Sequence, residues 1–205
     1  MKKISIMDYG LGNTRSLFNS IKKVKHNVTL YSENKKNDFD ILFIPGVGSF
    51  AKAVELLNKK DFYKIINKAK EEKKIIVGIC LGMHLLFSKG TEHGTNTGLN
   101  FIEGSVNILS KEKNFKLPNI GWKKVQFTDN CKHDFLKKFN DCKFYFIHSY
   151  AARPKSDKNI YAYTKYNNAD FVSVTGNENI LGMQFHPEKS ADNGLELIKN
   201  IINFF

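Results

Sequence analysis

The sequence predicts an α/β fold with a mainly parallel central sheet, helices on both of its faces and a second half richer in strands. Three observations lead to this class. Short apolar runs alternate with amphipathic stretches in the first half, which is typical of parallel strands joined by helical crossovers. Strand-like runs with short connections dominate the second half. The 205 residues, 41% hydrophobic and 25% charged, suit one domain over residues 1–205, because no break in composition marks a boundary.

The first half contains four expected strands and three expected helices. Short uninterrupted apolar runs predict buried strands, whereas apolar residues spaced three and four apart predict one face of a helix. Leu17, Ile21 and Val24 show the second pattern. The expected strands are Lys3–Met7, Val28–Tyr31, Asp40–Ile44 and Ile75–Ile79, and the expected helices are Thr14–Val24, Ala51–Leu57 and Phe62–Lys70.

The second half contains six expected strands and only two expected helices. Its apolar runs are separated by short connections, which is why this half is expected to be richer in strands. The expected strands are Val106–Leu109, Lys123–Phe127, Phe144–His148, Tyr161–Tyr166, Phe171–Val174 and Ile180–Phe185, and the expected helices are His133–Phe139 and Leu195–Phe204.

The formal net charge of +12 raises the question of a nucleic-acid ligand. Arginine reads phosphates and base edges better than lysine, yet it occurs only at Arg15 and Arg153, and lysines are scattered through every segment. We therefore expect no nucleic-acid partner, although the positive field favours acidic or phosphorylated ligands.

Targeting and metal-binding signals are missing from the sequence. The apolar stretch Ile75–Leu81 is far shorter than the roughly 20 residues that span a bilayer. Near the N-terminus, Asp8 interrupts a short apolar run, unlike the core of a signal peptide. The cysteines Cys80, Cys131 and Cys142 form no CxxC pair, and no Cys/His cluster has zinc spacing. These features predict a cytoplasmic protein with reduced thiols, no membrane contact, no metal and no cofactor.

The sharpest chemical signal is a cysteine between two glycines, Gly78-Ile79-Cys80-Leu81-Gly82, where an apolar strand meets a helical segment. This is the cysteine version of the nucleophile elbow. Side chains two residues before or after the nucleophile would collide with neighbouring backbone, and the glycines avoid this. A helix N-terminus also favours the thiolate. A buried structural cysteine with incidental glycines is the alternative interpretation.

A histidine and a carboxylate follow the last expected strand. His186 and Glu188 lie two residues apart around Pro187, directly after that apolar run. A carboxylate that accepts a hydrogen bond from one imidazole nitrogen leaves the other nitrogen facing a thiol. Alone the pair is more often a surface feature, but together with Cys80 it predicts a base and its orienting partner.

A glycine loop follows the strand Asp40–Ile44 in the sequence Pro45-Gly46-Val47-Gly48-Ser49. Such a loop can bring backbone N–H groups close to a ligand, so it is a candidate donor for an oxyanion hole beside the N–H of Leu81. The ending of a phosphate-binding P-loop is missing here.

The order of the motifs PGVGSF, GICLGM, FIHSY and MQFHPEKS resembles that of class I glutamine amidotransferases. The strings DYGLGN, LPNIGW and HPEKS further resemble the glutaminase subunits of imidazole glycerol phosphate synthases. The resemblance covers essentially the whole chain and implies the three-layer fold of that family. It makes Cys80 the nucleophile, His186 the acid and base, and Glu188 its orienter.

The resemblance also implies roles for residues around this triad. Val47, Gly48 and Leu81 would form the oxyanion hole. The residues that would contact the substrate glutamine are Gly46, His84, Ser149 and Tyr150. His84 stands where the family usually has glutamine, and Lys123 stands where asparagine is usual.

The implied activity is hydrolysis of glutamine to glutamate and ammonia. The ammonia would pass to a (β/α)₈-barrel cyclase subunit, in a heterodimer that makes imidazole glycerol phosphate and aminoimidazole carboxamide ribotide for histidine biosynthesis. Two alternatives stay open. The departures at His84 and Lys123 leave room for a related glutaminase serving another synthase, such as one that amidinates a cell-surface sugar. A cysteine peptidase could use the same elbow and histidine.

A partner that receives ammonia must cover the mouth of the active site. Asn13, Trp122, Lys123 and Lys189 are the interface candidates, because they are expected in loops next to the motifs that build the site. Trp122 is the strongest, since a large aromatic side chain in a loop anchors either an interface or the core.

Overall fold

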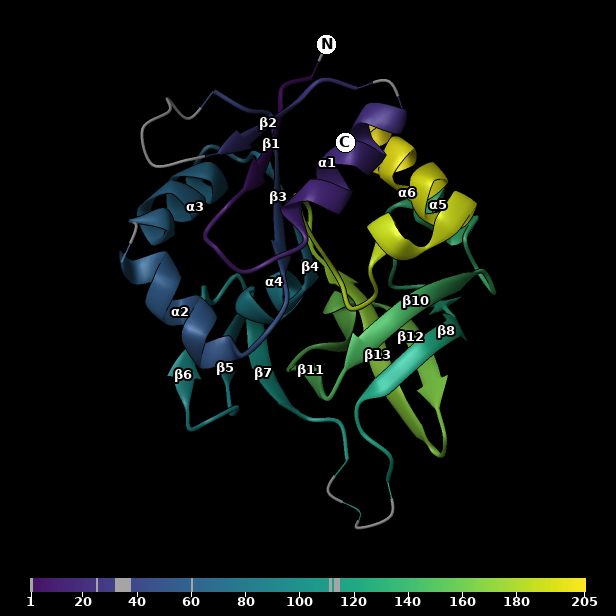
Figure 1. Ribbon diagram of the computed structural model, residues 1–205. Helices are drawn as coiled ribbons and strands as arrows, with labels where there is room; N and C mark the ends of the chain where they lie inside the picture. Colours follow the sequence, from purple (N-terminus) through teal and green to yellow (C-terminus); the bar gives the residue numbers. More distant parts are fainter. Residues whose placement is uncertain (1, 25, 32–37, 60, 111, 113–114) are drawn as a thin grey trace.

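An eight-stranded mixed sheet runs through the centre of the computed structural model, which describes residues 2–24, 26–31, 38–59, 61–110, 112 and 115–205 (Figure 1). Its strand order is β2-β1-β3-β4-β14-β13-β12-β9. The first five strands run parallel to one another. Each of the last three, β13, β12 and β9, pairs antiparallel with the strand before it in this order. The strands are β1 Ile4–Met7, β2 Val28–Tyr31, β3 Ile41–Gly46, β4 Ile75–Cys80, β9 Gln126–Phe127, β12 Ile160–Tyr166, β13 Ala169–Gly176 and β14 Ile180–Met183.

Helices cover both faces of this sheet, as the α/β class predicts (Figure 1). Neighbouring residues of a strand point to opposite faces. On β1, Ile4 and Ile6 therefore pack in the core beneath α1 and α6, whereas Met7 packs in the core beneath α2 and α3. The helices are α1 Thr14–Lys23, α2 Phe50–Lys59, α3 Phe62–Glu71, α4 Leu81–Leu85, α5 Asp134–Lys137 and α6 Ala191–Phe204.

Two smaller sheets flank the central one. A four-stranded sheet has the order β11-β7-β5-β6, and β8 pairs with β10 in an antiparallel ribbon. These strands are β5 Phe87–Gly90, β6 Asn96–Thr97, β7 Ile102–Ile108, β8 Asn119–Lys124, β10 Lys143–His148 and β11 Tyr150–Pro154. Between them they place the loops around Ser149 and Pro118 at one end of the central sheet.

The strands β5, β6 and β11 are not predicted by the sequence patterns, and β8 lies earlier in the chain than predicted. The expected strand Lys123–Phe127 is divided between β8 and β9, so Trp122 and Lys123 lie in a strand and not in a loop. The reason is compositional. Asn119 and Gly121 are unfavourable in strands, and only pairing with β10 supplies the hydrogen bonds that order them.

Several other boundaries differ from expectation, and β7, for example, begins at Ile102, four residues before the strand expected over Val106–Leu109. The strand expected over Ile180–Phe185 ends at Met183 because the chain then changes neighbours: the His186 N–H donates to the Tyr145 carbonyl on β10 at 2.9 Å. Helix α6 begins at Ala191, four residues early, because its polar first turn hides the apolar period. The helix expected over 133–139 is reduced to the single turn of α5.

The carboxyl ends of three adjacent strands meet at one edge of the sheet. β3 ends at Gly46 directly beside Cys80 at the end of β4, and β14 leads into the segment that carries His186. In open α/β sheets this edge is where ligands bind. No helix in the described ranges of the chain is long and apolar enough to cross a membrane.

Candidate active site

Cys80 occupies a strained turn between β4 and α4. Its φ of 54° and ψ of −108° lie outside the regions that L-residues ordinarily adopt. The two flanking glycines make the turn possible. A Cβ on Gly78 would lie 2.5 Å from the Gly82 carbonyl oxygen, and a Cβ on Gly82 would lie 1.7 Å from the Ile44 carbonyl oxygen. The spacing predicted from the motif is therefore required by close backbone contacts, and the strain is located at the reactive thiol.

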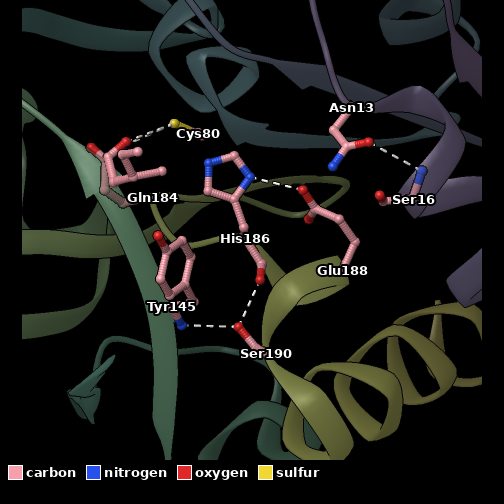
Figure 2. Close-up of polar contacts among 9 residues, drawn as sticks. Asn13, Ser16, Cys80, Tyr145, Gln184, His186, Glu188 and Ser190 are labelled. Atoms are coloured by element: carbon pink, nitrogen blue, oxygen red, sulfur yellow. Dashed lines mark hydrogen bonds and ion pairs between the residues drawn. The ribbon is translucent and has the colours of Figure 1, made fainter. Parts of the chain in front are cut away.

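His186 and Glu188 form a buried pair behind this turn. The Nδ1–H of His186 donates to Oε1 of Glu188 at 2.8 Å, and both side chains are almost fully buried (Figure 2). Both residues belong to the segment around η2, the 3₁₀ turn Pro187–Lys189. Because Nδ1 is held by the carboxylate, Nε2 is the free nitrogen, and it makes no hydrogen bond with any residue in the described part of the chain.

The charge state of His186 depends on its neighbours. Burial lowers the pKa of His186, but Cys80 and Glu188 together outweigh this effect and raise the pKa to about 10. An imidazole with such a pKa is protonated at neutral pH when a negative charge lies beside it. The arrangement therefore favours the imidazolium form of His186.

Two further polar groups reach the Cys80 sulfur. The Ile147 carbonyl oxygen lies 4.0 Å from Sγ, and Nε2 of Gln184 lies 3.8 Å from it. Figure 2 shows Cys80 and Gln184 on the side of the His186 ring opposite Glu188. The sulfur thus sits between the imidazole, a side-chain amide and the end of β10.

Ser190 and Tyr145 hold the histidine segment against β10. The Ser190 hydroxyl accepts the Tyr145 N–H at 3.0 Å and donates to the His186 carbonyl at 2.6 Å (Figure 2). The His186 N–H donates to the Tyr145 carbonyl at 2.9 Å. These three bonds fix the backbone of His186 from both sides.

A cavity of about 450 Å³ opens beside the thiol. This volume suits a small molecule. Seven of the residues singled out from the sequence line it together with Cys80, and they are Val47, Gly48, Leu81, His84, Ser149, Tyr150 and Lys189. Gly46 lies beneath the cavity as the strand partner of Cys80, where a Cβ would meet the Tyr9 hydroxyl oxygen and Leu81.

The remaining interface candidates lie elsewhere. Asn13 caps α1 by accepting the Ser16 N–H at 3.3 Å. Trp122 is 46% exposed on β8, so the interpretation as a core anchor is wrong. Lys123 points to the opposite face of β8, where its amine lies over the Tyr166 ring.

Three polar side chains of this site were not predicted from the sequence. Glu92 lines the cavity, and its Oε2 accepts the Phe50 N–H at 2.8 Å at the start of α2. Gln184 contacts the thiol, and Ser190 fixes the histidine segment. The string QFHPEKS includes the last two, but no residue-type rule separates them from ordinary neighbours. Glu92 lies in a polar loop without any motif.

His148 is a buried neutral histidine at the end of β10. Its Nδ1–H donates to the Tyr150 carbonyl at 2.8 Å, and its Nε2 accepts from the Asn119 amide at 3.0 Å. Burial lowers the pKa of His148 to about 3. The ring therefore serves as an uncharged brace between β8 and the turn at Ser149 that lines the cavity.

Comparison with known proteins defines the class to which this fold and site belong. Residues 5–203 match the family described as "Glutamine amidotransferase class-I". The chain belongs to the class I glutamine amidotransferases, as the order of its motifs predicts.

Relatives within the family share one description. The chain is 35% identical to "Imidazole glycerol phosphate synthase subunit HisH" of Sulfurimonas denitrificans, and the match covers 98% of each chain. It is 38% identical to "Imidazole glycerol phosphate synthase subunit HisH 2" of Methanococcus maripaludis, over 97% of this chain and 98% of that one. The HisH subunit of Thermotoga maritima is 35% identical, over 98% and 96% of the two chains.

Solved structures agree on the fold. The structure described as PurLQS from Thermotoga maritima superposes with a TM-score of 0.78 at 17% identity, covering 100% of this chain and 99% of that one. A crystal structure of a glutamine amidotransferase gives a TM-score of 0.74 at 14% identity, covering 98% and 99%. At these identities the likeness concerns the fold alone.

Proposed function

We propose that this chain is the glutaminase subunit of an imidazole glycerol phosphate synthase and acts in histidine biosynthesis in the cytoplasm. It hydrolyses glutamine to glutamate and ammonia and delivers the ammonia to a (β/α)₈-barrel cyclase subunit, as one domain spanning residues 1–205. The observation that carries this proposal is the strained Cys80 beside the buried His186–Glu188 pair. The full-length similarity to HisH subunits supports the choice of synthase.

The first half of the reaction forms a thioester. The Cys80 thiolate attacks the side-chain amide carbon of glutamine, and the carbonyl oxygen becomes an oxyanion. His186 then transfers its proton to the departing nitrogen, so that ammonia leaves and a γ-glutamyl thioester remains. Glu188 keeps the imidazole in the orientation that serves both proton transfers.

The second half of the reaction releases glutamate. The neutral His186 takes a proton from water, and the resulting hydroxide adds to the thioester carbon. The carbon–sulfur bond breaks, and Cys80 leaves as a thiolate beside the protonated imidazole. The N–H groups of Leu81 and of the Val47-Gly48 loop are the proposed oxyanion donors, and one such donor contributes about 3 kcal/mol.

The cavity offers complementary groups for the amino-acid end of glutamine. Glu92 supplies a carboxylate that suits the α-ammonium group, and backbone groups at Ser149 and Tyr150 suit the α-carboxylate. His84 lines the same wall. These residues are the proposed glutamine contacts, together with Gly46, the strand partner of Cys80 at the end of β3.

The β8–β10 ribbon is the proposed binding surface for the cyclase subunit. Trp122 faces Tyr145 across the ribbon at a ring separation of 6.2 Å, and Ile120 pairs with Ile147. Ile120, Trp122 and Ile147 are 50%, 46% and 39% exposed, which is unusual for side chains of this size. Because Ile147 also lines the cavity, a protein bound here would adjoin the site of ammonia release. Lys189 lines the same cavity as Ile147, whereas Lys123 lies on the opposite face of β8 and Asn13 caps α1, so these three are secondary interface candidates.

The central experiment measures glutamate release from the purified chain and labelling by a glutamine analogue that carries an electrophile. The analogue should modify Cys80, and glutamine should protect it. Ammonia transfer is then assayed with the barrel cyclase and its phosphorylated imidazole precursor, and separately with a sugar-amidinating synthase. Transfer only to the sugar synthase would overturn the choice of acceptor, and peptide cleavage without glutamine hydrolysis would overturn the glutaminase assignment.

Trp122 tests the proposed interface. We expect Trp122→Ala to weaken cyclase binding by roughly 30-fold, the size of an interface hot spot, while labelling of Cys80 in the isolated chain stays unchanged. Phe204→Ala is the matched control, because Phe204 is an exposed aromatic residue on α6. Titration calorimetry measures both. Equal affinities for Trp122→Ala and the parent protein would remove the β8–β10 ribbon from the interface.

A further inference from the structure

Gln184 lies between a histidine and the reactive sulfur and has no part in the reaction described above. Its side chain is completely buried, and its backbone N–H is fixed to the Ser173 carbonyl at 2.9 Å. Its Oε1 lies 2.7 Å from Nε2 of His84, and its Nε2 lies 3.8 Å from Sγ of Cys80. One amide group therefore links the two side chains.

The chemistry of the groups sets the direction of these two hydrogen bonds. An amide oxygen only accepts hydrogen bonds, so the Nε2 of His84 must carry the proton that it donates. Burial lowers the pKa of His84 to about 4, against the smaller effect of the Gln184 hydrogen bond, and the ring is therefore neutral. With its oxygen held by His84, the amide must turn its NH₂ group towards the sulfur.

We propose that Gln184 donates a hydrogen bond to the Cys80 thiolate and that His84 is a positioning residue that keeps the amide in the donating orientation. This inference rests on the proposed role of Cys80 as nucleophile. A hydrogen bond to an ionised sulfur favours the thiolate. If the amide rotated, its oxygen would face the sulfur and would disfavour the same charge.

The arrangement gives a reason for the histidine at position 84. The resemblance to the family places a glutamine there that helps to hold the substrate. In this chain the Nε2 of His84 is hydrogen-bonded to Gln184, so only the rest of the His84 ring is left to contact a ligand in the cavity. His84 therefore acts on the sulfur through the Gln184 amide.

Several titratable groups surround the Cys80 sulfur, and a pH profile reports on all of them together. They lie in the loop after β1, on α4, in the loop after β5, on β10 and in the segment around η2, and they are Tyr9, His84, Glu92, His148, His186, Glu188 and Lys189. Comparing variants that leave the charged groups in place isolates the contribution of the amide, because Gln184 itself does not titrate.

The test is the pH dependence of Cys80 alkylation by iodoacetamide in the full chain, followed at the Cys80 peptide by mass spectrometry. Gln184→Met keeps the length of the side chain and removes the donor. We expect its alkylation midpoint to rise by about one pH unit, which corresponds to about a tenfold smaller thiolate population below the midpoint. His84→Phe keeps a ring and should raise the midpoint in the same direction by a smaller amount.

Rescue separates positioning from simple packing. His84→Gln restores an N–H that can donate to the Gln184 oxygen, so its midpoint should return to the parent value. His133→Phe makes the same histidine-to-phenylalanine change beneath α6, where His133 packs on Phe205, and should leave the midpoint unchanged. A parent-like midpoint in folded Gln184→Met would overturn the proposal. A parent-like midpoint in His84→Phe, or no recovery in His84→Gln, would overturn the role of His84.

The readout does not depend on glutamine hydrolysis. Shifted midpoints in a chain that fails to hydrolyse glutamine would sustain this inference and reject the proposed function. Unshifted midpoints in a chain that does hydrolyse glutamine would reject this inference and leave the proposed function standing. Should Gln184→Met fail to fold, the pair His84→Phe and His84→Gln still decides the result, because both side chains are close to histidine in size.

Discussion

Gly82→Ala tests the physical basis of the Cys80 turn. The added Cβ would lie 1.7 Å from the Ile44 carbonyl oxygen, and real Cβ atoms do not approach other atoms closer than 3.0 Å. The start of α4 must therefore retreat from β3 by at least 1.3 Å, the difference between these distances. Both partners are backbone, so no flexible side chain can absorb the shift.

The expected losses follow from this displacement. Overpacking of this kind costs about 3 kcal/mol, and a chain of this length loses about 10 °C in melting temperature for that amount. The turn carries both Cys80 and the Leu81 N–H, so the reacting groups move with it. A shift of about 1 Å in such groups lowers the rate about 100-fold.

Thermal unfolding and initial rates of glutamate release measure the two effects. Gly94→Ala is the control for stability: a Cβ there meets nothing within 4 Å, and only its φ of +98° is unfavourable. That change should cost about 1 kcal/mol. A Gly82→Ala protein that melts within 2 °C of the parent and releases glutamate at the parent rate would refute the steric argument.

Three further predictions concern the proposed triad. Cys80→Ser should lower glutamate release by at least about 10⁴-fold without unfolding the chain, and an electrophilic glutamine analogue that labels Cys131 or Cys142 in the parent would contradict the assignment. Glu188→Gln should retain about 100-fold more activity than His186→Ala, since the carboxylate only orients and stabilises the ring; equal rates for Glu188→Gln and the parent would show that Glu188 has another role. The pKa of His186 is raised to about 10, above its ordinary 6.5, so protonation of His186 stabilises the fold fully below pH 6.5 and this contribution is lost as the pH rises through 10. In Cys80→Ser the His186 resonance should titrate well below pH 10 by NMR, and an unchanged titration would refute the coupling between the two side chains.

The sequence was sufficient to predict the fold class and the helices and strands that precede Cys80. Buried parallel strands such as β3 and β4 are continuous apolar runs, and helices such as α1 repeat their apolar residues with a regular period. Both signals are local, so they survive without knowledge of the partner elements. The chemical motifs were equally local: the glycines around Cys80 and the pair His186 and Glu188 each fit within five residues.

Only the tertiary structure decided which distant groups meet the thiol. Gln184 and Glu92 are set by pairings between segments that lie far apart in the chain, and no residue-type rule foresees them. The same holds for β8, whose residues Asn119 to Trp122 lie outside the strand expected over Lys123–Phe127 and find their hydrogen-bond partners only on β10. Trp122 shows the difference most clearly: its identity marks an anchor, but whether it anchors core or surface depends on which face of the ribbon it occupies. Periodicity depends on residues that are neighbours in the sequence. Burial, and contacts between residues far apart in the chain, depend on how the sheets and helices pack.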